Sequence, residues 1–233
     1  MPWESRLEHH VRDQRYVLWR HVDRVIALAD SALHQAGSDS DLAQRILDTA
    51  LDHGERRGWD ALHLHEIAQA MGITVADIQR HYAQKDAIAE AWFERADAAL
   101  LAVAETPGWM ELSTRQRLSR AIFAWLDALA PHRRLTAAML RYKFQPEHLH
   151  LQALGLTRIS RTVQWIRESA CLVSVGWRRE LEEAALTGIY VSTFAYWLTD
   201  DSPGAERTHA FLDRLLTIAE MAALQVAPPR ASS

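Results

Sequence analysis

The sequence predicts an all-α protein, and three observations support this fold class. Apolar residues recur at spacings of three and four along almost the whole 233-residue chain, which places them on one face of successive helices. Good helix formers such as Leu, Ala, Arg, Glu and Gln fill the positions between them, and only 9 Gly and 7 Pro interrupt the pattern. Few segments alternate with the period of two that is typical of a strand.

The first 105 residues are predicted to form an extension, residues 1–40, and a small helical domain, residues 41–105. A helix over residues 11–36 is followed by Gly37-Ser38-Asp39-Ser40, a run that predicts a linker. Asp41 then supplies an N-cap candidate, with Gln44 three residues later. The small domain is expected to contain helices at residues 41–53, 64–71, 75–82 and 85–104.

A second helical domain is predicted over residues 106–226. It begins at Thr106-Pro107-Gly108, the next clear break in the periodic pattern. Its expected helices lie at residues 114–129, 132–142, 156–170, 177–199 and 203–224. The last seven residues, 227–233, are rich in Pro and Ser and are expected to be disordered.

Composition and charge exclude several classes of protein. With 48% hydrophobic residues the chain can bury a sizeable core, so wholesale disorder is excluded. The single cysteine, Cys171, cannot form an internal disulfide, and residues 1–10 lack the apolar run of a secretory signal. We therefore expect a cytoplasmic protein. The longest apolar run, residues 184–198, is too short and too polar for a membrane span.

No pattern in the sequence indicates an enzyme. We recognise none of four common catalytic or cofactor-binding motifs: a nucleophile elbow, a phosphate-binding loop, a dinucleotide fingerprint or a catalytic carboxylate pair. The histidine pairs at residues 9–10, 63–65 and 148–150 lack the spacing of a metal site. We expect no catalytic residue, no bound metal and no cofactor.

The strongest local signal lies at residues 67–78, Ile-Ala-Gln-Ala-Met-Gly-Ile-Thr-Val-Ala-Asp-Ile. Two short helices separated by a turn with glycine at its start form the helix-turn-helix pattern. Gly72 can adopt the left-handed conformation that ends the first helix, and Thr74 is placed to cap the second. Spacing alone leaves open a plain helical hairpin without DNA binding.

If the second helix enters a major groove, its outward residues would meet the bases. Gln79 and Arg80 can hydrogen-bond adenine and guanine edges, and Val75 and Ala76 can touch a thymine methyl group. Three residues at the end of that helix and the start of the next would contact phosphates: His81, Tyr82 and Lys85. Residues 41–100 carry 6 Lys/Arg and 11 Asp/Glu, a balance that disfavours nucleic acid.

Three separated segments are informative together: Ile46-Leu47-Asp48-Thr49-Ala50, Arg57-Gly58-Trp59-Asp60-Ala61 and His81-Tyr82-Ala83-Gln84-Lys85-Asp86-Ala87-Ile88. With them, residues 46–94 resemble the DNA-binding domain of TetR/AcrR-type transcriptional regulators. The resemblance implies a homodimer with an N-terminal three-helix domain on operator DNA and a C-terminal helical domain that binds an effector and dimerises. It places these residues at contact positions: Thr74, Val75, Ala76, Gln79, His81, Tyr82 and Lys85. His63 departs from the Ser or Thr cap usual in the family.

The C-terminal half shows a second likeness. Leu126-Asp127-Ala128-Leu129-Ala130-Pro131-His132-Arg133 and much of residues 185–215 resemble coenzyme-Q protein nine, an accessory family of ubiquinone biosynthesis. That family shares the TetR fold but carries isoprenoid lipid and touches the membrane without binding DNA. The second reading is therefore a membrane-associating lipid carrier.

Aromatic residues of the C-terminal domain predict an apolar ligand pocket for a hydrophobic small molecule or isoprenoid lipid. Nine Trp is a high count, and wide aromatic walls suit a flat or isoprenoid ligand. Plain core packing is the alternative for about half of these residues. The predicted lining is Trp125, Met139, Tyr142, Trp165, Tyr190, Phe194 and Trp197.

The last predicted helix is amphipathic. Such a face serves packing or dimerisation in most helices, and a membrane surface in a few. With the preceding helix it would form a four-helix dimer interface in the regulator reading, and a peripheral membrane contact in the carrier reading. The residues of this face are Phe211, Leu212, Leu215, Leu216 and Ile218.

Overall fold

The computed structural model describes residues 35, 37–143 and 149–226, and every regular element in that part of the chain is an α- or 3₁₀-helix. The predicted all-α class is therefore confirmed. The structure divides into two compact units, residues 1–48 and 49–233. The expected helix at 11–36 and the expected disordered tail at 227–233 lie outside the described residues, apart from residue 35.

The predicted linker at residues 37–40 is wrong. Residues 37–57 form one uninterrupted helix, which crosses the boundary between the two units, so the linker run lies within it. Residues 37–40 are all exposed. The helix penalties of Gly, Ser and Asp are at most about 1 kcal/mol each, and the helix continues for more than four turns beyond them. Local propensity is too weak to break a helix that is already propagating.

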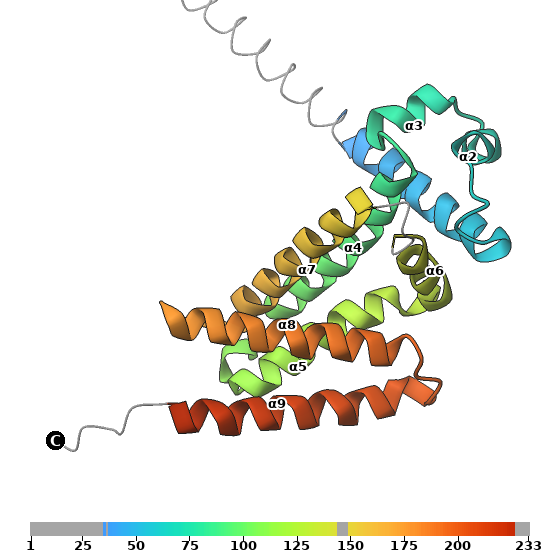
Figure 1. Cartoon of the computed structure of the whole chain (residues 1–233). Coiled ribbons are helices and arrows are strands. Elements are labelled where there is room, and N and C mark those ends of the chain that lie inside the picture. The colour runs from blue at the N-terminus through green and yellow to red at the C-terminus, as the bar shows by residue number, and fades with distance from the viewer. Residues whose placement is uncertain (1–34, 36, 144–148, 227–233) are drawn as a thin grey trace, which may run out of the picture. The chain divides into compact units, whose positions relative to one another are not determined.

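The second unit continues with three helices, labelled in Figure 1: α2 over Leu64–Met71, α3 over Val75–His81 and α4 over Lys85–Ala104. The predicted bounds of α2 and α4 are confirmed. The third helix ends one residue earlier than predicted, because Tyr82 has extended backbone angles (φ −134°, ψ 106°) and serves as the C-cap of α3.

Beyond a turn at residues 105–108 the chain forms a 3₁₀ turn, Trp109–Glu111, and then α5 over Thr114–Leu129. A capping box starts α5, because Ser113 and Gln116 each accept a hydrogen bond from the other's backbone N–H. A second 3₁₀ turn, Ala130–His132, leads into α6 over Arg133–Lys143.

Three long helices complete the domain: α7 over Leu149–Ser169, α8 over Trp177–Trp197 and α9 over Glu206–Val226, the last preceded by the 3₁₀ turn Pro203–Ala205. The predicted start of α7 at residue 156 is seven residues late. The helix includes Gly155, whose penalty of about 1 kcal/mol a helix of this length tolerates.

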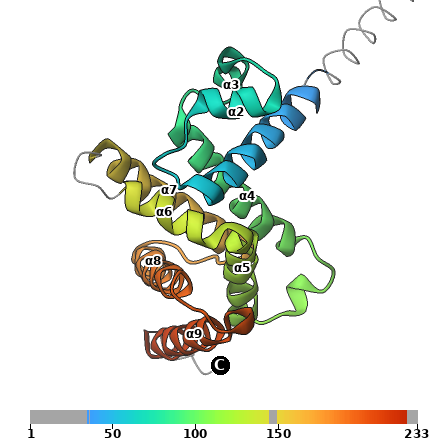
Figure 2. The same ribbon diagram turned by 90° about the vertical axis from the view of Figure 1, so that its right-hand side faces the viewer.

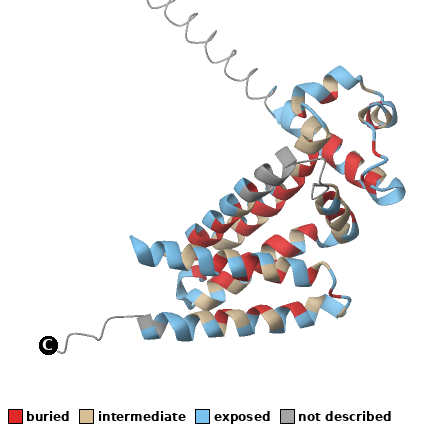
Figure 3. Ribbon diagram, viewed as in Figure 1, coloured by how far each residue is buried: buried red, intermediate tan, exposed pale blue. Residues whose placement is uncertain are grey.

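The core of the second unit lies where α4, α5, α7 and α8 face one another. The most extensive helix packing is that of α4 along α5, and α9 packs against α5 and α8. Figure 2 shows α8 and α9 side by side, and Figure 3 shows the buried residues running along α4 and α5. None of the described helices has the length and apolar character needed to cross a membrane.

Candidate nucleic-acid interface and ligand groove

Gly72 makes the turn between α2 and α3. Its backbone angles (φ 66°, ψ 30°) are left-handed, a conformation in which a side chain is strained. The N–H of Gly72 donates to the Gln69 carbonyl at 3.2 Å, and the N–H of Ile73 donates to the Ala68 carbonyl at 3.0 Å. The last carbonyls of α2 are thereby satisfied, and the chain reverses into the next helix.

Thr74 and Asp77 form a capping box at the start of α3. The Asp77 N–H donates to Thr74 Oγ1 at 3.1 Å, and the Thr74 N–H donates to Asp77 Oδ2 at 2.7 Å. The Thr74 hydroxyl also donates to Asp77 Oδ2 at 2.7 Å, and the two bonds that the carboxylate accepts from Thr74 lower the pKa of Asp77. The predicted N-cap at Thr74 is confirmed. Asp77 thus stabilises the start of α3, and the hydrogen bonds of the cap offset part of its negative charge.

A small apolar core holds α2 against α3. Ile67 and Ile78 are completely buried, Ala68 is buried beside them, and Met71 and Ile73 are half-buried. Because Ala68 is small, the two helices can approach closely. The angle between α2 and α3 is therefore set by residues on the inner side of α3. The residues on its outer side are not needed for this packing.

The outer side of α3 carries the four residues predicted to meet bases. Val75, Ala76, Gln79 and Arg80 are all exposed, Val75 to 44%. The Arg80 guanidinium pairs with Asp77 Oδ1 on the same helix, and 66% of the arginine side chain remains exposed. An exposed pair of this kind contributes less than about 1 kcal/mol, so Arg80 can exchange Asp77 for another acceptor.

The residues predicted to contact phosphates are less exposed. Thr74 is exposed, His81 and Lys85 are half-buried, and Tyr82 is buried with 7% exposure. Tyr82 thus packs within the domain at the end of α3.

Lys85 is tied to the turn that precedes α2. Its Nζ donates to the carbonyls of Trp59 at 3.1 Å and Asp60 at 3.4 Å, and lies 4.8 Å from the centre of the Tyr142 ring. Burial lowers the pKa of this ammonium group. Since an ammonium has three N–H donors, one is left for a further acceptor.

The first helix of the motif lacks a side-chain cap. His63 stands at the N-cap position of α2 with no side-chain hydrogen bond to the helix, and its ring stacks on His65 at 5.5 Å. Glu66 lies in the first turn, where a carboxylate suits the helix dipole, and pairs with Arg57 at 2.5 Å. The two acidic residues of the motif, Glu66 and Asp77, are thus each paired with an arginine.

Four of the seven aromatic and apolar residues predicted to line a pocket lie together. Trp125 is in edge contact with Tyr190 (5.2 Å) and Phe194 (4.9 Å), and Phe194 stacks on Trp197 at 6.1 Å between ring centres. Trp125, Tyr190 and Trp197 are buried, and these four side chains pack against one another in the core. The remaining three lie apart: Met139 is buried on α6, Tyr142 borders Lys85, and Trp165 is 38% exposed.

A buried polar network that the sequence analysis missed crosses this core. Asp97 on α4 accepts hydrogen bonds from Trp125 Nε1 (2.8 Å), Arg158 (2.8 Å) and Thr162 Oγ1 (3.0 Å). Burial and the nearby Asp97 charge raise the pKa of Tyr190 far above its ordinary range. One signal was available: Asp97 and Arg158 are charged residues among the apolar positions of long helices, where an ionic partner is required.

A groove of about 530 Å³ opens between the start of α5, the start of α8 and the end of α9. None of the seven predicted pocket residues lines it. Its lining is Thr114, Arg115, Leu118, Leu172, Ser174, Arg178, Leu181, Glu182, Ala185, Leu186, Ile189, Leu216, Ala219, Glu220, Ala222 and Ala223.

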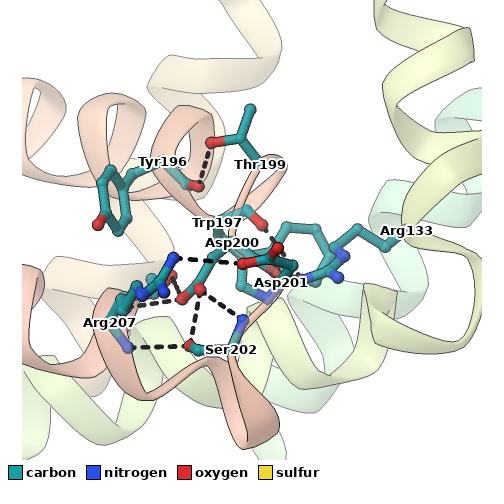
Figure 4. A network of polar contacts seen from close by, with 9 residues as sticks. Arg133, Tyr196, Trp197, Thr199, Asp200, Asp201, Ser202 and Arg207 are labelled. Carbon is teal, nitrogen blue, oxygen red and sulfur yellow. Dashed lines mark hydrogen bonds and ion pairs between the residues drawn. The ribbon is translucent and has the colours of Figure 1, made fainter.

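The turn from α8 to α9 is held by Asp200, as Figure 4 shows. Its carboxylate accepts from the backbone N–H and hydroxyl groups of both Ser202 and Thr208 at 2.6–2.9 Å. Burial raises the pKa of Asp200, but these hydrogen bonds outweigh it and hold the pKa well below its ordinary value. Arg133 donates to the carbonyl oxygens of Trp197 and Asp200, which fixes the same turn to α6.

The predicted apolar face of α9 divides into two parts. Leu212 and Leu216 are buried, and Phe211 and Leu215 are half-buried, Phe211 stacking on Tyr196 at 4.8 Å. Ile218 is 59% exposed. Most of this face therefore packs within the chain.

Two solved structures share this architecture. The TetR transcriptional regulator from Nitrosomonas europaea is 37% identical, with a TM-score of 0.70, and the match covers 78% of this chain and 99% of that one. A tetR-family transcriptional regulator from Streptomyces coelicolor is 23% identical, with a TM-score of 0.53, covering 77% of this chain and 84% of that one, and shows the shared fold.

Two further comparisons concern the sequence. The COQ9 family model matches residues 183–223, which include most of α8 and α9. No curated protein matches this chain. The helix-turn-helix over α2 and α3, the helical domain behind it and the 37% identity over 99% of a known regulator agree: this chain belongs to the TetR family of transcriptional regulators.

Proposed function

We propose that this protein binds operator DNA as a homodimer and responds to a hydrophobic small molecule. Residues 41–105 would form the DNA-binding domain, and residues 106–226 the domain that binds the ligand and dimerises. The observation that carries the proposal is the outer face of α3, where Val75, Ala76 and Gln79 stand exposed on a helix fixed from its inner side. This is the form in which a recognition helix enters the major groove.

Each residue of the face has a role that fits its chemistry. Gln79 would hydrogen-bond an adenine edge, and Val75 and Ala76 would contact a thymine methyl group. Arg80 would exchange its exposed partner Asp77 for a guanine or a phosphate. In this proposal Thr74, His81 and Lys85 border the groove and contact phosphates, while the buried Tyr82 supports the end of α3.

Dimerisation would use the outward sides of α8 and α9. These sides carry exposed large apolar residues: Trp177, Leu181, Val191, Ile218 and Met221. A two-fold pair would present two copies of α3 to half-sites about 34–36 Å apart. A ligand that changes the separation of the two recognition helices would then prevent both from docking at once.

The test is operator selectivity. A duplex selected by the purified protein from a random DNA library is titrated with wild-type protein and with Gln79→Ala, by fluorescence anisotropy at fixed salt. We expect affinity to fall by about 1–3 kcal/mol, with the loss traced to one base pair. The matched control is Gln69→Ala, an exposed glutamine on α2 outside the proposed face. Equal affinity of wild type and Gln79→Ala for every duplex would refute the proposal.

A lipid carrier is the second candidate, because the COQ9 family model matches residues 183–223. That match leaves the helix-turn-helix unexplained. The packing of Leu212 and Leu216 inside the chain also removes most of the face that α9 would offer to a membrane. Native mass spectrometry of the purified protein, together with the DNA titration, separates the two functions: bound isoprenoid lipid without DNA binding would favour the carrier.

A further inference from the structure

We propose that the groove between α5, α8 and α9 is a binding site for an uncharged, largely hydrocarbon small molecule. The inference deepens the proposed function, on which it rests, by giving the ligand a place and a chemical class. The volume of about 530 Å³ falls within the range of about 300–1,000 Å³ usual for small-molecule sites.

The walls of the groove are apolar and small. Four alanines line it, Ala185 on α8 and Ala219, Ala222 and Ala223 on α9. Because their side chains are small, the space between the two helices stays open at these positions. The floor is made of large apolar residues that the domain already buries: Leu118, Leu186, Ile189 and Leu216. A hydrocarbon lying on this floor would gain apolar contact over most of its length.

The acidic and basic residues at one end of the groove are paired with each other. Arg115 on α5 pairs with Asp213 at 2.5 Å and with Glu220 at 3.8 Å, both on α9. Arg115 therefore ties α9 to α5 at the edge of the groove.

At the other end of the groove the charged residues are Glu182 and Arg178. Glu182 on α8 accepts from the buried Arg167 of α7 and, at 2.7 Å, from the Ser174 hydroxyl. Arg178 lies over the Trp177 ring. The four charged residues of the lining balance one another, since Arg115 and Arg178 face Glu182 and Glu220. A charged ligand would therefore meet no excess of opposite charge in a groove that is otherwise largely apolar. The site therefore selects a ligand without charge.

Two other occupants fit less well. The chain's own end, Ala-Pro-Pro-Arg-Ala-Ser-Ser at residues 227–233, has no large apolar side chain to insert. A second copy of the chain finds most of its apolar contacts outside the groove. Of the five outward residues proposed for dimerisation, Leu181 lines the groove, and the other four do not: Trp177, Val191, Ile218 and Met221. A small molecule would instead fill the hollow between the two helices and fix their spacing.

The experiment uses the full chain and the uncharged fluorophore N-phenyl-1-naphthylamine. We expect it to bind with one site per chain, to be displaced by dodecanol and to resist displacement by dodecanoate. Ala185→Phe and Ala219→Phe, on opposite walls, should each weaken binding by at least about tenfold, because the new ring occupies the site. Ala184→Phe is the matched control, an exposed neighbour of Ala185 that does not line the groove.

Several outcomes would overturn the inference. The groove is not the site if the fluorophore fails to bind the wild type, or binds both wall variants as tightly as Ala184→Phe. Displacement by dodecanoate as effective as that by dodecanol would remove the claim of an uncharged ligand. If sedimentation shows that the wall variants lose self-association while fluorophore binding is unchanged, a second copy occupies the groove. Circular dichroism establishes that each variant is folded, and two variants guard against the failure of one.

DNA binding is measured separately on the same proteins. A wild-type protein that selects its operator but does not bind the fluorophore defeats this inference alone. Fluorophore binding in a protein that selects no DNA defeats the proposed regulator and leaves the groove as a ligand site.

Discussion

The helix-turn-helix and the helical domain behind it are held together by different kinds of contact. In the motif, the fixing interactions join residues close in sequence: Gly72 to Gln69, and Thr74 to Asp77. In the helical domain, Asp97 is held by Trp125, Arg158 and Thr162, which lie 28, 61 and 65 residues further along the chain. The first region is defined by local geometry, and the second by which distant residues meet.

This difference has a consequence for stability. Local caps contribute about 1 kcal/mol each and affect mainly the helix they end. A buried carboxylate that joins three helices, α4, α5 and α7, affects all of them, because its loss removes the hydrogen-bonded partner of the buried Arg158. Substitutions in the two regions should therefore differ in size and in reach.

The largest effect is expected at Asp97. Asp97→Ala should lower the free energy of unfolding by about 3–5 kcal/mol, since the buried Arg158 would lose its partner at 2.8 Å and keep only the more distant Glu90 and Glu94. Urea unfolding at fixed protein concentration measures this loss. Glu94→Ala is the control: Glu94 also lies near Arg158, at 3.7 Å, but is 58% exposed, so the loss should stay below about 1 kcal/mol. Equal losses for the two variants would mean that burial does not distinguish the two carboxylates.

The second effect concerns the α8–α9 turn and depends on pH. Asp200→Asn should cost about 2 kcal/mol at pH 7, because the carboxylate accepts four hydrogen bonds at the start of α9. The pKa of Asp200 is lower in the folded chain than in the unfolded chain, so its contribution is complete above about pH 4 and is lost as pH falls further. The difference in stability between wild type and variant should be constant from pH 7 to 5 and shrink below pH 4. A constant difference down to pH 2 would contradict this account.

The third effect is that replacing glycine by alanine should change stability in opposite directions at two positions. Gly72→Ala should destabilise the chain by about 1–2 kcal/mol, because the residue has a φ of 66°. Gly188→Ala lies within α8 with no atom near the added methyl group, and should stabilise by up to about 1 kcal/mol. Thermal unfolding compares the two, and hydrogen exchange should place the Gly72→Ala loss in α2 and α3. The same sign for both variants would show that backbone conformation does not control the turn.

The smallest effect sharpens the role of Lys85. Its ammonium has one N–H beyond those given to Trp59 and Asp60, so Lys85→Met should reduce the salt slope of DNA binding by about 0.9, the value for one phosphate. Arg179→Met, an exposed cation at the start of α8, should leave the slope unchanged. An unchanged slope for Lys85→Met would mean that the lysine only fixes the turn before α2.

The contrast between the regions also explains what the sequence could predict. The bounds of α2, the glycine turn and the Thr74 cap follow from neighbours in the sequence, and the structure confirms them. The prediction of a linker at residues 37–40 was wrong because it used the helix propensity of these four residues alone, without the helix that continues to residue 57. Tyr82 was predicted to contact a phosphate from its position at the end of α3, and that position alone did not indicate that only 7% of the residue is exposed.

The groove between α5, α8 and α9 was harder to predict for the same reason. Aromatic residues were expected to line a pocket, but Trp125, Tyr190 and Phe194 pack on one another. The groove is lined by residues of three helices and of the α7–α8 connection, with many alanines and leucines among them, from Thr114 to Ala223. Alanines on an exposed helix face form no sequence pattern that distinguishes the lining of a groove from an ordinary surface. Only the positions of distant helices can show it.

The way α3 is anchored affects which substitutions this protein could accept during evolution. The residues that start and orient the helix, Gly72, Thr74 and Asp77, are distinct from Val75, Ala76 and Gln79, which face outward. Substitutions at these three outward residues can therefore change the proposed DNA contacts while the anchoring of the helix is preserved, and a duplicated gene could change its DNA target without first losing a stable product. The residues proposed to contact bases and the residues that fix the helix are therefore different positions of one seven-residue helix and its caps.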